Sequence, residues 1–231
     1  MPKKTKRKSR RSTNKKVIHQ VYGVFDDGVP LKDIPVFYEN VKLTKQFCKK
    51  YKIRHKMWNF KKCNHLINTH FKQYKKLWND FRLPIQKADF IRYCILYHEG
   101  GIYVDCDIHP IGNIDHLFQK DHFFVTWADD KKNLPYNAVL GSHKKTELYK
   151  DILEHCEESY YLKAKNDIYK KWKGRFVFQT TGHYMLQRVL KNKSKKNILN
   201  IMKIHTKSGK IVKGPKPLFE DNNASMWYSD K

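Results

Sequence analysis

The sequence is poor in acidic residues and has no long apolar run. Its 231 residues hold 22 Asp and Glu against 48 Lys and Arg, a formal net charge of +26 at pH 7. No stretch of about 18 apolar residues occurs, so no transmembrane helix is expected. Such an excess of positive charge favours an anionic partner, a class that includes nucleic acid, acidic membrane and phosphorylated small molecules.

The first 16 residues lack any apolar side chain after Met1. They hold nine Lys and Arg and no acid. We expect a disordered basic tail over residues 1–16, because it has no apolar surface to bury. The tail could serve as a nuclear address, a polyanion contact or a solubilising segment. A secretory signal would need an apolar segment here. We therefore expect a cytoplasmic protein, in the host cytoplasm if it is viral, with one domain over residues 17–231.

Cysteine pairs at the spacing of zinc or redox motifs are also missing. The five cysteines are scattered, and no CxxC occurs. This pattern indicates reduced thiols, as in a cytosolic setting. The histidines likewise show no recognised metal-ligand spacing, so a histidine metal site is not expected.

Strand-like and helix-like segments alternate along the rest of the chain. Strands are expected over residues 16–25, 52–60, 102–108, 123–128, 137–142 and 198–206. Helices are expected over residues 34–51, 61–81, 83–101, 147–160 and 181–192. This alternation predicts an α/β domain around a mixed or mostly parallel sheet.

Two aspartates lie two residues apart in the expected strand 102–108. Residues at this spacing share one face of a strand, so Asp105, Asp107 and Tyr103 are expected to point away from the core. The two carboxylates would repel each other alone. A divalent cation shared with a phosphate would make the pair favourable, whereas two solvated acids at a strand end are the simpler interpretation.

An acid and a base precede this pair. Asp89 and Arg92 are three residues apart in an expected helix that Gly100 and Gly101 end, so they share a helix face. An Asp can accept sugar hydroxyls, and an Arg binds hydroxyls or phosphate oxygens as a rigid fork. A surface ion pair is the alternative.

The segment KADFIRYCILYHEGGIYVDCDIHPI, residues 87–111, resembles a known sugar-binding region. This DXD-containing region is shared by Och1-like mannosyltransferases, bacterial capsular-polysaccharide glycosyltransferases and the large clostridial glucosylating toxins. The opening VIHQVYG, residues 17–23, resembles the first strand of that family, with Tyr22 where the family usually has Trp. The resemblance extends from about Val17 to Trp227.

The resemblance implies a GT-A fold, a Rossmann-like α/β sheet that binds a nucleotide sugar, with Mn²⁺ or Mg²⁺ on the diphosphate. It implies a catalytic set of Asp89, Arg92, Asp105 and Asp107. It also implies which residues contact the nucleotide sugar. Val21 and Tyr22 would contact the base, and Asp89 and Arg92 would hold the donor sugar. Tyr103 and Asp105 would contact the ribose and the sugar, and Asp107, with Asp105, would bind the metal.

Two later segments resemble further parts of the family's site. Asn137 opens NAVLGS, whose Asn contacts the donor sugar in the family. NNASMW, residues 222–227, resembles the family's closing loop, which implies a metal role for Asn222 and diphosphate contacts for Ser225 and Trp227. Met226 is an insertion relative to the commoner pattern, and Trp227 could instead anchor the end of the chain.

The implied activity is metal-dependent transfer of a hexose from a UDP- or GDP-sugar to a glycan or other hydroxyl acceptor. The family retains anomeric configuration. Because no residue here is recognisable as a covalent nucleophile, a front-face reaction is favoured. The cation would neutralise charge on the departing diphosphate. Positive groups and loop donors would supply further stabilisation.

Three other interpretations use the same residues. A basic nucleic-acid-binding protein explains the charge, but no zinc-finger or RNP signature occurs. An inactive relative that kept the GT-A fold is a second alternative. A haloacid-dehalogenase-like phosphatase also has a strand followed by DxD, with WADDKK, residues 127–132, as its second acidic pair. That interpretation leaves Asp89, Arg92 and the glycine pair unexplained.

Overall fold

The structure is a computed structural model of the chain. The residues that the structure describes are 16–25, 28–118, 123–127, 134–165, 173–191, 198–201, 204–206 and 217–222. A mixed six-stranded sheet runs through the centre, in the order β2-β1-β3-β6-β5-β7. Its strands are β1 (Val17–Val21), β2 (Arg54–Trp58), β3 (Gly101–Val104), β5 (Phe123–Trp127), β6 (Pro135–Ser142) and β7 (Ile198–Ile201).

Parallel and antiparallel pairs coexist in this sheet. Strand β1 is parallel to both β2 and β3, and β5 is parallel to β7. Strand β6 is antiparallel to β3 and to β5. The carboxyl ends of β1 and β3 and the amino end of β6 therefore meet at one edge of the sheet.

A second sheet of three strands lies beside the first, in the order β4-β9-β8. Its strands are β4 (Ile108–Pro110), β8 (Ile204–Thr206) and β9 (Phe219–Asp221). Strand β9 is antiparallel to β4, with Ile108 opposite Asp221, and parallel to β8. Since only residues 105–107 separate β3 from β4, the aspartate pair connects the two sheets.

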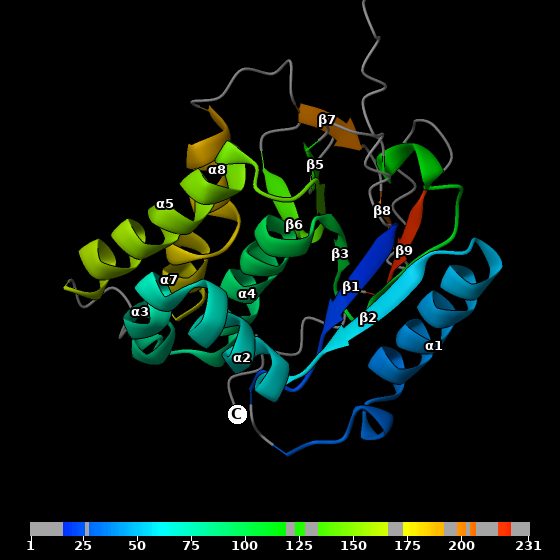
Figure 1. Ribbon diagram of the computed structural model, residues 1–231, viewed down its shortest axis with the longest axis horizontal. Helices are drawn as coiled ribbons and strands as arrows, with labels where there is room; N and C mark the ends of the chain where they lie inside the picture. The colour runs from blue at the N-terminus through cyan, green and yellow to red at the C-terminus, as the bar shows by residue number, and fades with distance from the viewer. Residues whose placement is uncertain are drawn as a thin grey trace, which may run out of the picture.

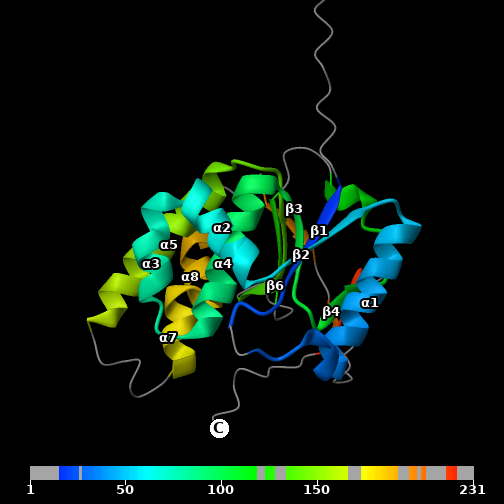
Figure 2. The same ribbon diagram turned by 60° about the horizontal axis from the view of Figure 1, so that its bottom comes forward.

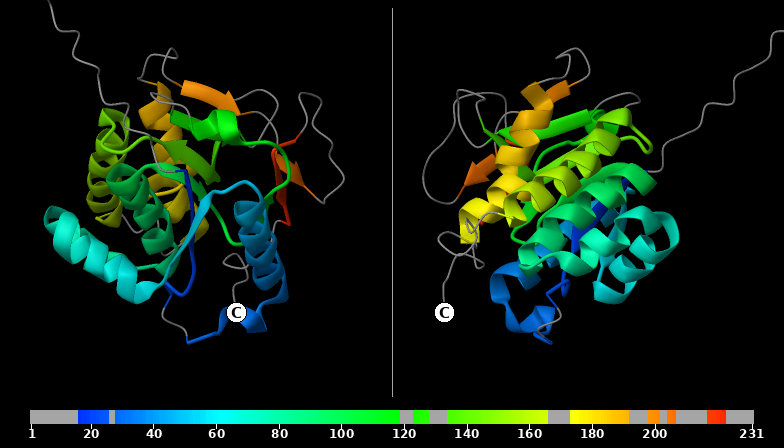
Figure 3. Two further views of the ribbon diagram at one scale, coloured as in Figure 1. Left: turned by 45° about the vertical axis from the view of Figure 1, so that its right-hand side comes forward. Right: turned by 90° about the vertical axis from the view of Figure 1, so that its left-hand side faces the viewer.

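Helices cover both faces of the large sheet (Figures 1 and 2). On one face lie α2 (Phe60–His70), η2 (Lys72–Tyr74), α3 (Lys75–Asp80), α4 (Pro84–Glu99), α5 (Glu147–Ala164), α7 (Lys173–Thr180) and α8 (His183–Lys191). On the other face lies α1 (Pro35–Lys50), which η1 (Leu31–Asp33) precedes. Helix α1 packs on β2 and on β4. The left view of Figure 3 shows α1 and the helix layer on opposite sides of the sheet. The short η3 (Asp115–Phe118) follows β4.

The core lies in two layers, one on each face of the sheet. Neighbouring residues of β3 alternate between them: Tyr103 belongs to the layer under α4, and Ile102 and Val104 belong to the layer under α1. All three are buried, which explains why this strand has no polar side. The expectation that Tyr103 points away from the core is therefore wrong, since α4 covers that face.

Most expected elements are present, and three of them are divided. The helix expected over 61–81 breaks at Phe71 into α2, η2 and α3. The strand expected over 102–108 divides into β3 and β4, and the one over 198–206 into β7 and β8, which join different sheets. Helix α7, η3 and β9 were not expected. No helix within the described ranges is long and apolar enough to cross a membrane.

Candidate active site

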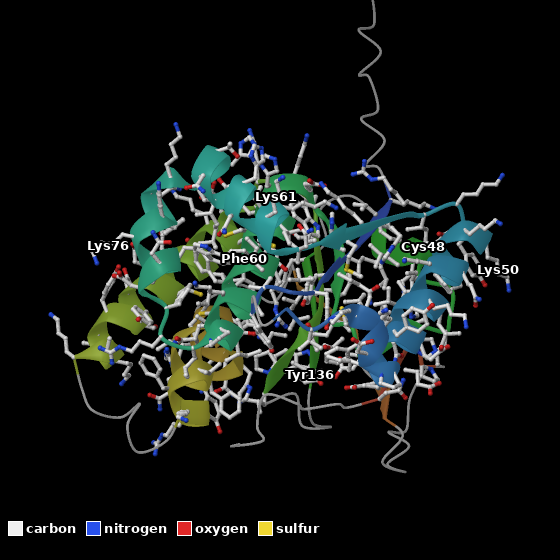
Figure 4. All side chains as sticks on the ribbon, turned by 90° about the horizontal axis from the view of Figure 1, so that it is seen from below. Cys48, Lys50, Phe60, Lys61, Lys76 and Tyr136 are labelled. Carbon is white, nitrogen blue, oxygen red and sulfur yellow. The ribbon has the colours of Figure 1, made fainter. Side chains whose placement is uncertain are left out.

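The predicted site residues gather at the edge where β1 and β3 end and β6 begins. Figure 4 views the molecule from this edge and labels Tyr136, the second residue of β6, near the middle of it. Helix α4 brings Asp89 and Arg92 to the same edge from the helix layer, because Asp89 contacts Asn137 and Arg92 contacts Asp105. The site is therefore built from the end of β1, from the consecutive pair α4 and β3, and from the start of β6.

The corner between α4 and β3 depends on two glycines. Helix α4 begins with Pro84 at its first position and ends at Gly100, which has φ +68°, while Gly101 has φ +99°. A Cβ on Gly101 would lie 2.6 Å from both the Cγ1 and the backbone oxygen of Val17. Only glycine fits this left-handed conformation and close approach, so β3 can pair with β1 directly after the helix ends.

Arg92 holds the centre of the site together. Its Nη2 lies 3.0 Å from Asp89 Oδ1, and its Nη1 donates to Asp105 Oδ2 at 3.3 Å and to the backbone oxygen of Asn137 at 2.8 Å. The guanidinium also lies 4.8 Å from the centre of the Tyr103 ring. The side chains of Arg92 and Asp89 are 4% and 6% exposed, so the pair is a buried one and not the surface pair of the simpler interpretation.

Burial and charge oppose each other in this network. Burial lowers the pKa of Arg92, but the carboxylate of Asp105, the Tyr103 hydroxyl and the carboxylate of Asp89 outweigh it and raise the pKa above its ordinary value. Burial raises the pKa of Asp89, and Arg92 acts against that rise. The guanidinium therefore stays charged and fixes the two carboxylates that flank it.

Asp89 is further bound through both of its oxygens. Asn137 Nδ2 donates to Asp89 Oδ1 at 2.9 Å, and Thr181 Oγ1 donates to Asp89 Oδ2 at 3.0 Å. Asn137, predicted from the sequence, thus lies beside Asp89 and Arg92. Thr181 was not predicted, because it lies more than ninety residues along the chain with no spacing signal that links it to Asp89.

The two aspartates lie in a turn and not in a strand. We call residues 105–107 the DXD turn: β3 ends at Val104, and Ile108 N donates to the backbone oxygen of Asp105 at 3.1 Å. The Tyr103 hydroxyl donates to Asp105 Oδ1, so the predicted proximity of Tyr103 and Asp105 is present although Tyr103 is buried. The expectation that one strand face carries both aspartates is wrong, because residues 105–107 form a turn. The alternation of side chains along a strand therefore does not relate Asp107 to Asp105.

Strand β9 brings Asn222 to the other side of the DXD turn. Asn222 N donates to the backbone oxygen of Asp107 at 2.9 Å, and Asn222 Nδ2 donates to Asn40 Oδ1 at 2.8 Å. The Asn222 Oδ1 atom is buried and has no hydrogen-bond partner within the described part of the chain. A buried acceptor oxygen of this kind, beside Asp107, is available to a cation.

The oxygen atoms available as metal ligands at the DXD turn suit a hard divalent cation. Asp105, Asp107 and Asn222 offer carboxylate and amide oxygens, the ligands that Mg²⁺ and Mn²⁺ prefer. In the described segments no group of three His, Cys, Asp or Glu side chains could hold a metal by itself. The residues fit a cation only with Asn222 and with further oxygens, such as those of a diphosphate.

The residues predicted for the nucleotide lie at the end of β1. Cys106 Sγ, in the DXD turn, donates to the backbone oxygen of Val21 at 3.3 Å. Tyr22 donates its hydroxyl to the backbone oxygen of Val29 at 2.8 Å and meets the Phe37 ring edge-on at 6.1 Å. Ser225 and Trp227, the other two predicted residues, lie outside the described residues.

Three further residues at the site were missed by the sequence analysis. Gln20 Nε2 donates to the backbone oxygen of Asp105 at 3.2 Å, and the Tyr136 hydroxyl donates to Asp221 Oδ2 at 2.9 Å. Burial raises the pKa of Tyr136, and the carboxylates of Asp221, Asp105 and Asp107 raise it further. Tyr136 and Asp221 directly precede the predicted Asn137 and Asn222, a signal that could have found them.

The fold and the site define a class of α/β protein that has an acidic turn at the carboxyl edge of its sheet. Residues 4–124 match the family described as glycosyltransferase sugar-binding region containing DXD motif. This match spans more than half of the chain, and the chain belongs to that glycosyltransferase family.

Curated relatives agree with the family. The chain is 28% identical over 130 residues to an uncharacterised glycosyltransferase of Acanthamoeba polyphaga mimivirus, covering 54% of this chain and 49% of the relative. It is 32% identical over 132 residues to a mannosyl phosphorylinositol ceramide synthase of Saccharomyces cerevisiae, covering 55% and 30%. It is 33% identical over 69 residues to an inositol phosphoceramide mannosyltransferase of Schizosaccharomyces pombe, covering 30% and 22%. The chain thus spans half or less of the length of these relatives.

A solved structure shares the fold. The PaToxG glycosyltransferase superimposes with a TM-score of 0.52 at 16% sequence identity, over 76% of this chain and 68% of that chain. The likeness confirms the fold class that the resemblance implied, a GT-A fold around a mixed sheet.

Proposed function

We propose that this protein transfers a hexose from a UDP- or GDP-sugar to a glycan or other hydroxyl acceptor, with Mn²⁺ or Mg²⁺ and with retention of configuration. One observation supports this most: the DXD turn is bonded to Arg92 on one side and to Asn222 on the other. Two relatives are named for mannosyl transfer or for mannosyl phosphorylinositol ceramide synthesis, so a mannosyl donor is the first to test.

The proposed roles follow the geometry. Asp107, Asp105 and the Asn222 amide oxygen would hold the cation, and a bound cation would neutralise negative charge on the diphosphate. Asp89 would accept hydrogen bonds from hydroxyls of the donor sugar, and Asn137 would hydrogen-bond to the same sugar through its side-chain amide. Arg92 would fix both residues, through the Asp89 carboxylate and the Asn137 backbone oxygen. Val21 and Tyr22, at the end of β1, would contact the base.

The proposed reaction is a single displacement on one face of the sugar. The acceptor hydroxyl oxygen forms a bond to the anomeric carbon while the bond from that carbon to the diphosphate oxygen breaks. The acceptor proton passes to the departing diphosphate. Attack from the leaving-group side retains the configuration and needs no side-chain nucleophile. Arg92 keeps the Asp105 carboxylate in place during this step, because it is buried and bound to Asp89.

Binding of the leaving nucleotide is the first test, because it needs no acceptor. Thermal unfolding is measured with UDP and with GDP, each with and without Mn²⁺, on the wild type, Asp107→Ala and the control Asp115→Ala. Asp115 is an exposed acid that pairs with Lys16 away from the DXD turn. A nucleotide at about 100 times its dissociation constant should stabilise the fold by about 2.7 kcal/mol.

We expect a Mn²⁺-dependent shift with one nucleotide in the wild type and in Asp115→Ala, and none in Asp107→Ala. An equal shift in Asp107→Ala would contradict the metal role. The absence of a shift with both nucleotides in the folded wild type would favour an inactive relative or a polyanion-binding protein.

A further inference from the structure

Three aromatic rings cluster where α7 meets α8. The Phe178 and His183 rings stack with their centres 4.1 Å apart and their planes at 36°. Tyr184 meets both rings edge-on, with its centre 5.9 Å from that of Phe178 and 4.5 Å from that of His183. We call these three residues the aromatic cluster.

The aromatic cluster adjoins the residues proposed for the donor sugar. Between the two helices, Thr181 donates its hydroxyl to Asp89 at 3.0 Å. A Cβ placed on Gly182 would lie 3.1 Å from the Phe178 Cα and 3.5 Å from Asp89 Oδ2. One turn of backbone therefore separates the cluster from Asp89. Helix α8 also packs on β6, which carries Asn137.

The cluster is partly exposed to solvent, through the ring of Tyr184. Tyr184 is 40% exposed, and Phe178 and His183 are half-buried. Helix α8 is anchored to the core by other residues, Met185, Leu186 and Val189. An exposed aromatic ring beside a polar site, in contact with two further rings, offers a flat apolar face to a ligand.

The cluster is also uncharged at neutral pH. Burial lowers the pKa of His183 to about 4. The chain as a whole has a net charge of +26, whereas this aromatic surface is uncharged. Such a surface suits a ligand with an apolar face better than a purely anionic one. The C–H bonds on one face of a hexose present such a surface, with partial positive charge toward the negative face of a ring.

We propose that Phe178, His183 and Tyr184 form the acceptor subsite, where a hexose of a glycan acceptor stacks on the exposed ring of Tyr184. This inference rests on the proposed function, since it places the acceptor hydroxyl beside the sugar held at Asp89. Phe178 and His183 hold the Tyr184 ring through edge-on contacts.

Hexoside binding tests the subsite directly. Saturation-transfer NMR is recorded with methyl α-mannopyranoside and with methyl α-glucopyranoside, in the presence of Mn²⁺ with UDP and then with GDP. The proteins are the wild type, Tyr184→Ala, Tyr184→Phe and the control Tyr38→Ala. Tyr38 is 44% exposed on α1, on the opposite face of the sheet.

We expect saturation to pass from the wild type to the protons on one face of a hexoside. In Tyr184→Ala the saturation-transfer signal should be at least five-fold weaker. Tyr184→Phe and Tyr38→Ala should keep it, because stacking needs the ring and not the hydroxyl. Thermal unfolding without ligand confirms that Tyr184→Ala is folded. An equal signal in the wild type and Tyr184→Ala, or no signal from either hexoside in the wild type, overturns the proposal.

The nucleotide shift separates this proposal from the proposed function. A normal nucleotide shift together with lost hexoside binding in Tyr184→Ala supports both. If Tyr184→Ala loses the nucleotide shift and keeps hexoside binding, the cluster holds the base and the acceptor proposal is wrong. If the wild type binds hexoside and no nucleotide, the acceptor subsite stands and the donor assignment fails.

Discussion

At the scale of single residues, the Arg92 and Asp89 pair differs from the exposed ion pairs of the described residues. Lys150 and Glu154, for example, form a pair across 4.0 Å with side chains 53% and 48% exposed. Water and salt screen such a surface pair, and it contributes little to stability. The Arg92 guanidinium is shielded from water and is satisfied by its protein partners. Removal of Asp89 takes away its closer carboxylate and leaves the buried charge only partly compensated, by Asp105 at 3.3 Å.

Asp89→Asn should therefore be strongly destabilising. The change keeps the size of the side chain and removes the charge that faces Arg92, and we expect the free energy of unfolding to fall by about 3 to 5 kcal/mol. Urea unfolding at pH 7 measures this change. Glu154→Gln, which breaks a surface pair, should change the same quantity by less than about 1 kcal/mol. Equal effects of the two substitutions would show that the buried pair is no more important than the exposed one.

At the scale of elements, local patterns predicted what local contacts decide. The spacing of Asp89 and Arg92 placed them correctly on one face of α4, because the helical repeat fixes that relation. The glycine pair correctly marked the end of α4, because glycine readily adopts the positive φ with which this helix ends. The division of the strand 102–108 could not be predicted, since β4 is defined by its pairing with β9, over a hundred residues later.

Long-range contacts also explain which site residues were missed. Thr181 reaches Asp89 only because α7 packs beside α4 and α8 beside β6. Tyr136 reaches Asp221 only because β9 pairs with β4 in the second sheet. Neither relation leaves a periodic trace in the sequence. Family resemblance supplied Asn137 and Asn222, whose positions beside Asp89 and Asp107 agree with a shared site.

The corner between α4 and β3 yields a second prediction. Gly101→Ala would place a methyl group 2.6 Å from the backbone oxygen of Val17, in a left-handed conformation, so β1 and β3 must separate. We expect a loss of about 3 kcal/mol or more in urea unfolding. Gly28→Ala is the matched control, because Gly28 also has a left-handed φ, +71°, but no atom of the described residues beyond its chain neighbours lies within 4 Å of its added Cβ.

In the control Gly28→Ala, the free energy of unfolding should fall only by the cost of a left-handed alanine, about 1 to 2 kcal/mol. A Gly101→Ala protein as stable as Gly28→Ala would mean that the contact with Val17 is not rigid. The corner would then be able to adjust without disturbing the DXD turn.

At the scale of the whole molecule, the candidate site lies at the seam between two sheets. The DXD turn leaves the large sheet at Val104 and enters the small one at Ile108, and β9 returns to pair there. Asp105 is thus fixed by the helix layer through Arg92, while Asp107 is bonded to Asn222 beyond β9. The distance between the two carboxylates depends on how the two sheets are held together.

The whole fold should also weaken as the pH falls, because three partly or fully buried histidines are neutral in it. Burial lowers the pKa of His19, His55 and His183 to about 4. Trp58 Nε1 donates to His19 Nδ1 at 3.1 Å, and the other ring nitrogen lies 2.9 Å from the backbone oxygen of Gly100, so the neutral ring satisfies both contacts. A proton on Nδ1 would face the Trp58 N–H.

Between pH 4 and about 6.5 the unfolded chain binds protons at these histidines and the folded chain does not, so stability is present above pH 6.5 and is lost on acidification. Each histidine contributes a slope of up to about 1.4 kcal/mol per pH unit in that window. Urea unfolding at pH 7.5, 6.5, 5.5 and 4.5 should therefore show a steep fall below pH 6.5. His19→Gln should reduce this slope by about 1.4 kcal/mol per pH unit, whereas His116→Gln, at an exposed position, should leave it unchanged. The same slope in all three proteins would mean that His19 is protonated in the folded state, and that its contacts with Trp58 and Gly100 do not require a neutral ring.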